Sequence, residues 1–340
     1  MRVTILGLVF IVLVACTERE PTISPTVEPT LPPTFEPTLM PNFNDYIEMQ
    51  SVTLPGTLWS PFMPPLEEGT PTMVRGLLKI PKSRGQIPAV VITHGCGGVG
   101  PGEVAWERRL NEMGIATLVV YSLASRNVPD MCTGRYETNI ATVLTDAYRA
   151  LDYMAEHPRI DPQRIAILGL SFGGRTALWA SHTRFQERYG SSQNQFAAHL
   201  AFYPASCYLQ LADETEVSGK PMRIFHGEQD DWTPLEQCQA YVERLTRADV
   251  DVILYEYPNA LHSFDVPNMP YLEVPNALTP GNCAFIEQDG QIIDPETGQE
   301  PSVESSCVEK GVSVGHNASA EAQAVSDVKE FLILTFGLDE

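Results

Sequence analysis

The chain alternates short apolar runs with amphipathic stretches along most of its length. Residues 89–93 are almost entirely apolar, which is typical of a strand covered on both faces. At residues 140–157, apolar side chains recur at helical spacing on one face. By these two patterns we expect strands at residues 49–53, 73–80, 89–93, 115–120, 165–168, 199–203, 222–225 and 252–257, and helices at residues 103–113, 140–157, 176–181, 235–248 and 320–336.

The alternation of strands with helices predicts an α/β fold. We expect a mostly parallel, doubly wound sheet with helices on both faces, formed by a domain at residues 46–340. The strands at residues 49–53 and 73–80 lie among proline-rich loops, and we expect both at the edge of the sheet. An Asp-Pro pair at residues 161–162 is expected to end the helix before it.

Residues 1–15 have the features of an export signal. Arg2 places a positive charge at the N-terminal end of the segment. The apolar run at residues 4–14 is too short to span a bilayer, which takes about 20 residues. The run ends in Leu-Val-Ala-Cys, which resembles a bacterial lipobox, so we expect cleavage before Cys16 and lipidation of its thiol. The alternative is an ordinary cleavable signal that has a cysteine there by chance.

Residues 16–45 join the lipidated cysteine to the folded domain. A Pro-Thr pair recurs every fourth residue from Pro21 to Thr38. Proline fixes φ and lacks an N–H donor, so neither helix nor sheet propagates, and we expect a semi-rigid spacer of polyproline II type. These features predict an extracytoplasmic protein that is lipid-anchored to the bacterial cell envelope.

The charge balance narrows the possible partners. The 340 residues carry 22 basic and 43 acidic side chains, a formal net charge of −21. Such a surface repels nucleic acid and anionic headgroups, so we exclude a nucleic-acid function and expect membrane contact only through the lipid anchor. The 43% of hydrophobic residues can form a sizeable core.

Ser171 is the first candidate for chemistry. It lies in Gly-Leu-Ser-Phe-Gly at residues 169–173, between an expected strand and an expected helix. The chain must turn sharply there, so glycines avoid clashes while the serine hydroxyl rises above the edge of the sheet. We interpret Ser171 as a nucleophile; the alternative is a tight packing turn with a buried serine.

A nucleophilic serine needs a base, and the base needs an orienting acid. In this arrangement the acid and then the base follow the serine in the chain, each just after a strand. Asp230 is the preferred acid, with Asp231 as its competitor. His262 is the preferred base, and its rival is His316, which precedes the last helix.

Acyl transfer also needs donors for a developing oxyanion. The loop His-Gly-Cys-Gly-Gly at residues 94–98 follows the strand at residues 89–93, and its small residues let backbone N–H groups face a substrate. We expect the oxyanion hole to consist of the N–H of Phe172 and that of Cys96 or Gly97. The alternative is a glycine-rich turn with no role in the chemistry.

Taken together, the motifs resemble one known family. The matching residues are His94-Gly95-x-Gly97-Gly98, Gly169-x-Ser171-x-Gly173-Gly174, Gly227-x-x-Asp230-x-x-x-Pro234 and Tyr257-Pro258-x-x-x-His262-x-Phe264. This set is similar to the dienelactone hydrolase family over roughly residues 70–264 and the final helix. The resemblance implies an α/β-hydrolase fold and no cofactor. Founding members use a cysteine nucleophile where this chain has Ser171, which favours a general carboxylesterase.

Six cysteines remain once Cys16 is set aside, an even number that suggests disulfides in an exported protein. Six cysteines allow 15 connectivities. Our preferred pairing is Cys96–Cys132, Cys207–Cys238 and Cys283–Cys307. No Cys-x-x-Cys spacing occurs, so we expect no metal site.

Two side chains are candidates for substrate contact. Arg126 follows a strand and has the geometry to hold a substrate carboxylate; a structural salt bridge explains it equally well. Trp232, beside Asp230, is expected to wall the acyl pocket or else to pack under the acid loop. Arg175 is expected to pack beneath the helix that follows Ser171. The insert at residues 266–315 is expected to form a surface flap near the site.

The sequence therefore predicts a serine esterase that cleaves small-molecule or polymeric esters through an acyl-enzyme on Ser171. Two alternatives stay open. The chain would be a non-catalytic surface binding lipoprotein if the scaffold had lost its activity, since a fold alone never proves one. A peptidase or an acyltransferase would use the same three residues.

Overall fold

The computed structural model describes residues 46–340, apart from 58–59, 61, 133–137 and 339–340. The expected signal, Cys16 and the linker lie outside the described residues. Within the described part, none of the helices is both long and apolar enough to cross a membrane.

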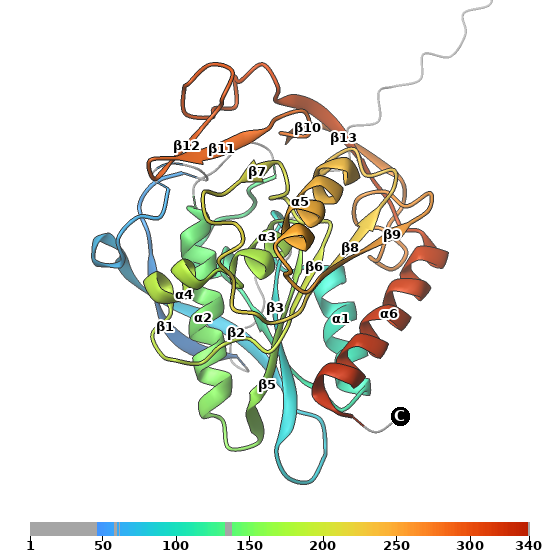
Figure 1. Ribbon diagram of the computed structural model, residues 1–340. Coiled ribbons are helices and arrows are strands. Elements are labelled where there is room, and N and C mark those ends of the chain that lie inside the picture. Colours follow the sequence, from blue (N-terminus) through green and yellow to red (C-terminus); the bar gives the residue numbers. More distant parts are fainter. Residues whose placement is uncertain (1–45, 58–59, 61, 133–137, 339–340) are drawn as a thin grey trace, which may run out of the picture. The chain divides into compact units, whose positions relative to one another are not determined.

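An eight-stranded sheet in the order β1-β2-β4-β3-β5-β6-β8-β9 is the centre of the fold (Figure 1). β2 runs antiparallel to both of its neighbours, and every other pair in this sheet is parallel. The fold is therefore α/β with a mostly parallel sheet, as the sequence predicts. The strands are β1 (Ile47–Thr53), β2 (Thr70–Lys79), β3 (Ile87–Thr93), β4 (Ala116–Val120), β5 (Ile160–Leu170), β6 (His199–Phe202), β8 (Met222–Gly227) and β9 (Val252–Tyr257).

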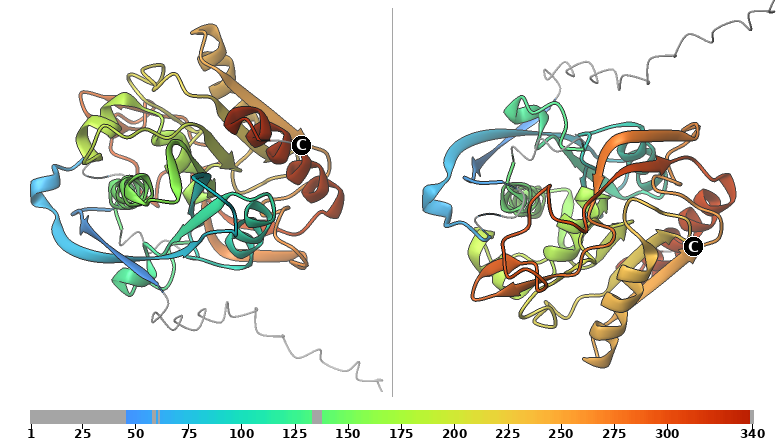
Figure 2. Two further views of the ribbon diagram at one scale, coloured as in Figure 1. Left: turned by 90° about the horizontal axis from the view of Figure 1, so that it is seen from below. Right: turned by 90° about the horizontal axis from the view of Figure 1, so that it is seen from above.

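Helices cover both faces of the sheet (Figures 1 and 2). α1 and α6 pack on one face, and α2, α3, α4 and α5 pack on the other. The helices are α1 (Pro101–Glu112), α2 (Ile140–Glu156), α3 (Phe172–Trp179), α4 (Thr183–Tyr189), α5 (Leu235–Arg247) and α6 (Ala318–Phe336), with short 3-10 turns η2 (Leu66–Glu68) and η3 (Ala124–Arg126).

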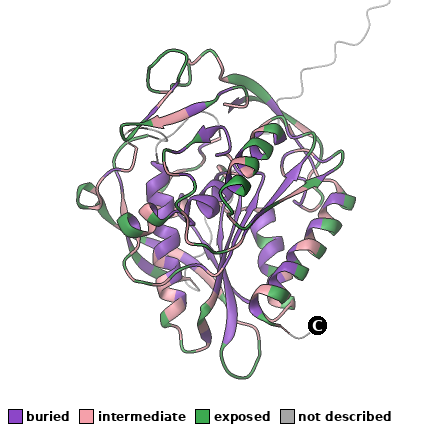
Figure 3. Cartoon of the chain, in the orientation of Figure 1, coloured by how far each residue is buried: buried purple, intermediate pink, exposed green. Residues whose placement is uncertain are grey.

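β3 shows why its sequence is apolar. Ala89 and Val91 lie in the core on the α2 side, whereas Val90 and Ile92 lie in the core on the α1 side. All four are completely buried, as the purple strands of Figure 3 illustrate. A strand with helices on both faces has no polar side, so the alternation typical of half-exposed strands is lost.

The insert at residues 266–315 is folded rather than an open loop. β10 (Leu272–Thr279) pairs with β13 (Glu309–Val314), and β11 (Phe285–Gln288) pairs with β12 (Gln291–Ile293). β11 also pairs with β7 (Leu209–Gln210), which belongs to the main domain. The insert lies at the end of the sheet where the parallel strands terminate (Figures 1 and 2).

All three expected disulfides are present. The Cα–Cα distances are 5.0 Å for Cys96–Cys132, 4.9 Å for Cys207–Cys238 and 5.0 Å for Cys283–Cys307. The first joins the loop after β3 to the loop after η3, the second ties the loop after β6 to α5, and the third closes the insert. The preferred pairing is confirmed.

Several boundaries differ from the prediction. β2 is not an edge strand, because β1 covers its outer side. α2 ends at Glu156, just before Pro158, so the proline that stops it comes earlier than the expected one at residue 162. α3 begins at Phe172, directly after Ser171, rather than at residue 176. α4 and β7 were not predicted.

Candidate active site

Ser171 stands at the junction of β5 and α3 in a strained backbone conformation. Its φ is 53° and its ψ is −108°, a region that non-glycine residues rarely adopt. Three backbone hydrogen bonds hold it there: its N–H donates to the carbonyl of Phe202 at 2.9 Å, and its own carbonyl accepts from the N–H of Arg175 at 3.0 Å and from that of Ala205 at 3.2 Å. The strain is thus maintained by neighbouring elements.

The glycines around Ser171 are required by close backbone packing. A Cβ atom on Gly169 would lie 1.9 Å from the carbonyl oxygen of Gly173, and one on Gly173 would lie 2.2 Å from that of Thr93. Both distances are far below van der Waals contact. The pentapeptide is therefore a sharp turn that presses α3 against β3.

Three side chains from three loops form one hydrogen-bonded relay. His262 Nε2 lies 3.0 Å from Ser171 Oγ, and His262 Nδ1 lies 2.8 Å from Asp230 Oδ2. Asp230 follows β8 and His262 follows β9. The side chains of His262 and Asp230 are almost completely buried. The structure thus brings the three expected residues together in the order serine, histidine, aspartate.

Asp230 is held as a buried carboxylate. Its Oδ1 accepts from the N–H of Trp232 and of Thr233, both at 2.9 Å, and its Oδ2 accepts from Thr233 Oγ1 at 3.0 Å. Burial works to raise the pKa of Asp230, but the neighbouring His262 and these hydrogen bonds outweigh it and lower the pKa. The aspartate is therefore charged at neutral pH and accepts the Nδ1–H of His262.

Two aromatic rings fix the plane of His262. Ring centroids lie 4.4 Å apart for Tyr203 and His262, and 4.9 Å apart for Trp232 and His262. The Tyr203 hydroxyl donates to Asp265 Oδ1 at 2.6 Å, which fixes the tyrosine in turn. These contacts leave the imidazole little freedom to rotate away from Ser171.

The rival acid and base lie in other environments. Asp231 Oδ1 accepts from the N–H of Ser313 at 2.7 Å, so it faces the insert strand β13. His316 Nε2 lies 2.5 Å from Glu321 Oε2, at the start of α6. Neither side chain takes part in the relay.

The loop after β3 is held beside Ser171 by buried groups. Glu103 accepts from the N–H of Gly95 at 3.2 Å and from that of Gly100 at 2.7 Å. Burial raises the pKa of Glu103 to about 7. The carbonyl of Cys96 accepts from the N–H of Met131 at 2.8 Å, which fixes the peptide group that carries the N–H of Gly97, and the carbonyl of Gly95 accepts from the N–H of Gly98 at 3.1 Å, which fixes the peptide group that carries the N–H of Cys96. Phe172, as the first residue of α3, has an N–H with no acceptor inside the helix.

A cavity of about 50 Å³ opens beside Ser171. Trp232 lines it, which agrees with the sequence interpretation that this residue walls the acyl pocket. Its Nε1–H donates to the carbonyl of Leu278 at 3.1 Å. Arg175, a residue of α3, donates to the carbonyl of Ala205 and to the hydroxyl of Tyr208 and also lines the cavity. The remaining lining residues are Cys96, Met131, Cys132, Phe172, Ala205 and Leu278. Gly97 does not line this cavity.

Leu278, Met131 and Ala205 were not found by sequence reasoning. Leu278 belongs to β10 of the insert, and Thr279 Oγ1 next to it donates to the carbonyl of Trp232 at 2.7 Å. The insert therefore contributes a wall of the cavity. The cysteines of the insert, which pair with each other, indicate from sequence that the insert is ordered. They do not indicate which of its residues face Ser171.

Arg126 forms a buried salt bridge, which is the second of its two sequence interpretations. Its guanidinium binds Asp146 with two hydrogen bonds of 2.7 and 3.0 Å, and its side chain is only 5% exposed. Further donors reach Thr53 Oγ1 and the carbonyls of Ser122 and Val52. The arginine is a buried structural link between β1, η3 and α2.

Comparison with known proteins places the chain in a family. A model of the dienelactone hydrolase family matches residues 74–333. The chain belongs to the dienelactone hydrolase family. A Synechocystis sp. protein named as a carboxymethylenebutenolidase is 21% identical over 211 residues, covering 56% of this chain and 81% of that protein.

Solved structures show the same fold. A dienelactone hydrolase-like promiscuous phosphotriesterase from metagenomic libraries covers 86% of this chain and 99% of its own, with a TM-score of 0.51 and 17% identity. Esterase 2 of Thermogutta terrifontis, phosphorylated by paraoxon, covers 84% and 97%, with a TM-score of 0.52 and 17% identity. The chain is thus a hydrolase-family protein with esterases among its structural relatives.

Proposed function

We propose that the protein is a serine carboxylesterase that works through an acyl-enzyme on Ser171. The observation that carries this proposal is the unbroken relay from Ser171 Oγ through His262 to buried Asp230, with bonds of 3.0 and 2.8 Å. A relay of this kind activates a hydroxyl that is otherwise a weak nucleophile.

The proposed reaction has two halves. His262 Nε2 accepts the Ser171 proton while Oγ attacks the ester carbonyl, and the protonated imidazole then gives that proton to the departing alcohol. Water, deprotonated by the same nitrogen, hydrolyses the acyl-enzyme and releases the acid. The N–H groups of Phe172 and Cys96 are the proposed oxyanion donors, with Gly97 as the alternative to Cys96.

The cavity beside Ser171 supports esters with a small acyl group. Its volume of about 50 Å³ is far below that of pockets for drug-sized ligands, about 300–1,000 Å³. Trp232, Leu278 and Met131 give it apolar walls. We therefore propose acetyl or propionyl esters as better substrates than long-chain esters.

The proposed location is the cell envelope, by a lipid on Cys16. Three disulfides suit an oxidising compartment, because such bonds are rare in the cytosol. The test compares incorporation of radiolabelled palmitate into two variants, Ser171→Ala and the double variant Ser171→Ala/Cys16→Ala. Labelling of the first and no labelling of the second would support the anchor. Incorporation that persists without Cys16 would remove this part of the proposal.

The test of the esterase proposal compares hydrolysis of p-nitrophenyl acetate and p-nitrophenyl octanoate. Ser171→Ala is expected to lower kcat by at least about 10⁴-fold, as removal of a triad nucleophile does elsewhere. Ser206→Ala, which changes a buried serine outside the relay, is the matched control and is expected to keep full activity. A wild type no faster than Ser171→Ala would instead favour a binding protein, and faster cleavage of a peptide anilide would favour a peptidase.

A further inference from the structure

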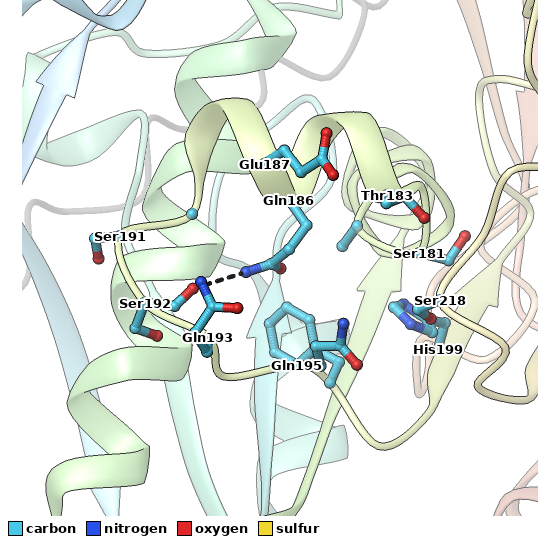
Figure 4. A pocket seen from close by; sticks show the side chains of 13 residues that line it. Ser181, Thr183, Gln186, Glu187, Ser191, Ser192, Gln193, Gln195, His199 and Ser218 are labelled. Carbon is cyan, nitrogen blue, oxygen red and sulfur yellow. Dashed lines mark hydrogen bonds between the residues drawn. The ribbon is translucent and has the colours of Figure 1, made fainter.

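A second cavity lies at the other end of α3, away from Ser171. It has a volume of about 260 Å³ and is enclosed by α4, the loop at residues 190–196, the start of β6 and Ser218 (Figure 4). α3 has eight residues, so about 12 Å of helix separates its Ala180 end from the serine. The cavity shares no lining residue with the one beside Ser171.

The lining of this second cavity is polar but almost uncharged. Eight of its thirteen lining residues are serine, threonine or glutamine, and Glu187 is the only one that carries a charge. Phe196 also lines the cavity but is only 2% exposed. Because no cation lines the cavity, phosphate and carboxylate ligands are disfavoured. Within the described residues, no group of three or more potential metal ligands occurs either.

His199 provides a buried acceptor at one side of the cavity. Its Nδ1 lies 2.9 Å from the carbonyl of Ala177, and because a carbonyl only accepts, Nδ1 carries the proton. Burial lowers the pKa of His199 to about 4, so the ring is neutral and Nε2 is a bare acceptor. Within the described part of the chain, Nε2 has no hydrogen-bond partner although the residue is only 1% exposed.

The opposite wall is pre-organised. Gln186 Nε2 donates to the carbonyl of Asn194 at 3.1 Å and to that of Ser192 at 3.5 Å, which ties the loop to α4 (Figure 4). Asp152 on α2 accepts from the hydroxyls of Ser191 and Ser192 and from Asn194 Nδ2. Held in this way, Ser191 Oγ keeps its lone pairs available as acceptors, whereas Ser192 Oγ already accepts from the N–H of Asn194 at 3.0 Å.

We propose that this cavity, defined by His199, Gln186, Gln193, Gln195 and Phe196, binds a neutral polyhydroxylated ligand such as one sugar ring. Hydroxyl groups donate to the His199 Nε2 acceptor and to Ser191 Oγ, and they accept from the side-chain amides of Gln193 and Gln195, since both N–H groups of the Gln186 amide are already used within the protein. At about 30 Å³ per water molecule, the volume is far more than one structural water needs.

The site is independent of the esterase proposal, and its test does not depend on turnover. The full chain in detergent, carrying Ser171→Ala, is titrated with methyl β-D-glucopyranoside, methyl β-D-xylopyranoside and methyl α-D-mannopyranoside. Binding is followed by saturation-transfer NMR and calorimetry. We expect at least one glycoside to bind at millimolar concentration, and sodium acetate and sodium phosphate not to compete with it.

Two variants locate the bound glycoside. Gln195→Ala alters an exposed lining residue and His199→Phe removes the buried acceptor; each is expected to weaken binding about two- to tenfold, as the loss of one hydrogen bond does. Gln50→Ala changes an exposed glutamine on β1 and is the matched control, expected to bind as the parent does.

The outcomes separate clearly. Weakened binding in Gln195→Ala with an unchanged melting temperature supports the sugar site, even if His199→Phe folds poorly. If none of the glycosides binds, or if Gln195→Ala and a folded His199→Phe both bind as tightly as Gln50→Ala, the proposal is overturned and the cavity holds solvent only.

Discussion

Replacing Asp230 by asparagine is the sharpest perturbation of the relay, because the structure dictates how the new amide must sit. Oδ1 receives two backbone N–H donors, from Trp232 and Thr233, each at 2.9 Å. The amide oxygen must stay at that position, since an NH₂ group there would face two donors. The NH₂ group therefore takes the place of Oδ2 and points at His262 Nδ1.

The tautomer of His262 must then change. An NH₂ group donates, so Nδ1 becomes the acceptor and the ring proton moves to Nε2, which faces Ser171 Oγ at 3.0 Å. A protonated Nε2 cannot accept the serine proton. We expect kcat/KM to fall by about 10³–10⁴-fold, or about 4–5.5 kcal/mol of transition-state stabilisation, as the same change does in other serine hydrolases.

The assay is p-nitrophenyl acetate hydrolysis with kcat and KM measured separately at pH 7–8, and melting temperatures recorded for each variant. KM should change little, because Asp230 does not touch the substrate. Asp231→Asn is the matched control: it alters the neighbouring carboxylate, which binds Ser313 instead, and should retain at least half of the activity. An Asp230→Asn enzyme within tenfold of wild type, or equal losses in both variants, would refute the reasoning.

Three further predictions concern the frame around the relay. Arg126→Met should lower the free energy of unfolding by about 3–5 kcal/mol, because it leaves Asp146 buried without its partner. The KM of the folded fraction should stay unchanged. A raised KM with normal stability in urea titrations would mean that the arginine binds substrate. Glu103 has a pKa of about 7 in the fold against 4.5 as its ordinary value, so its contribution to stability is complete below about pH 4.5 and about 3 kcal/mol of it is lost as the pH rises to 7. Urea midpoints of Glu103→Gln should therefore vary less between pH 4.5 and 7 than those of wild type, and an equal slope in both would contradict this. Changing Cys96 and Cys132 together to serine removes a disulfide that joins residues 36 positions apart, and the gain in chain entropy of the unfolded state should lower the free energy of unfolding by about 3–4 kcal/mol. Activity on p-nitrophenyl acetate should also fall. An unchanged urea midpoint would show that the disulfide contributes nothing to stability.

The parts of the fold that the sequence predicts are those whose residues have one dominant environment. β3 and the part of β5 from Ile165 to Leu170 are buried on both faces, and their apolar runs follow directly from that burial. The turn at Ser171 can also be predicted from the sequence, since Gly169 and Gly173 have no space for a side chain. The order of Ser171, Asp230 and His262 then follows from where the parallel strands end.

Features that depend on distant contacts could not be predicted. β7 has two residues and exists only because β11 of the insert pairs with it. The pairing of Arg126 with Asp146 joins residues 20 positions apart, one in η3 and one in α2, and either side chain alone would equally suit a ligand. α3 begins at Phe172 despite two glycines in its first turn, because close packing against β3 outweighs their low helix propensity.

The central claim is that Ser171 is the nucleophile, and covalent labelling tests it most directly. The full chain is treated with a fluorophosphonate probe, digested, and mapped by mass spectrometry, with Ser171→Ala and Ser206→Ala treated in parallel. The account predicts one adduct, on the peptide that contains Ser171, present in wild type and Ser206→Ala and absent from Ser171→Ala. An adduct on a different residue, or no adduct in the folded wild type, would contradict it.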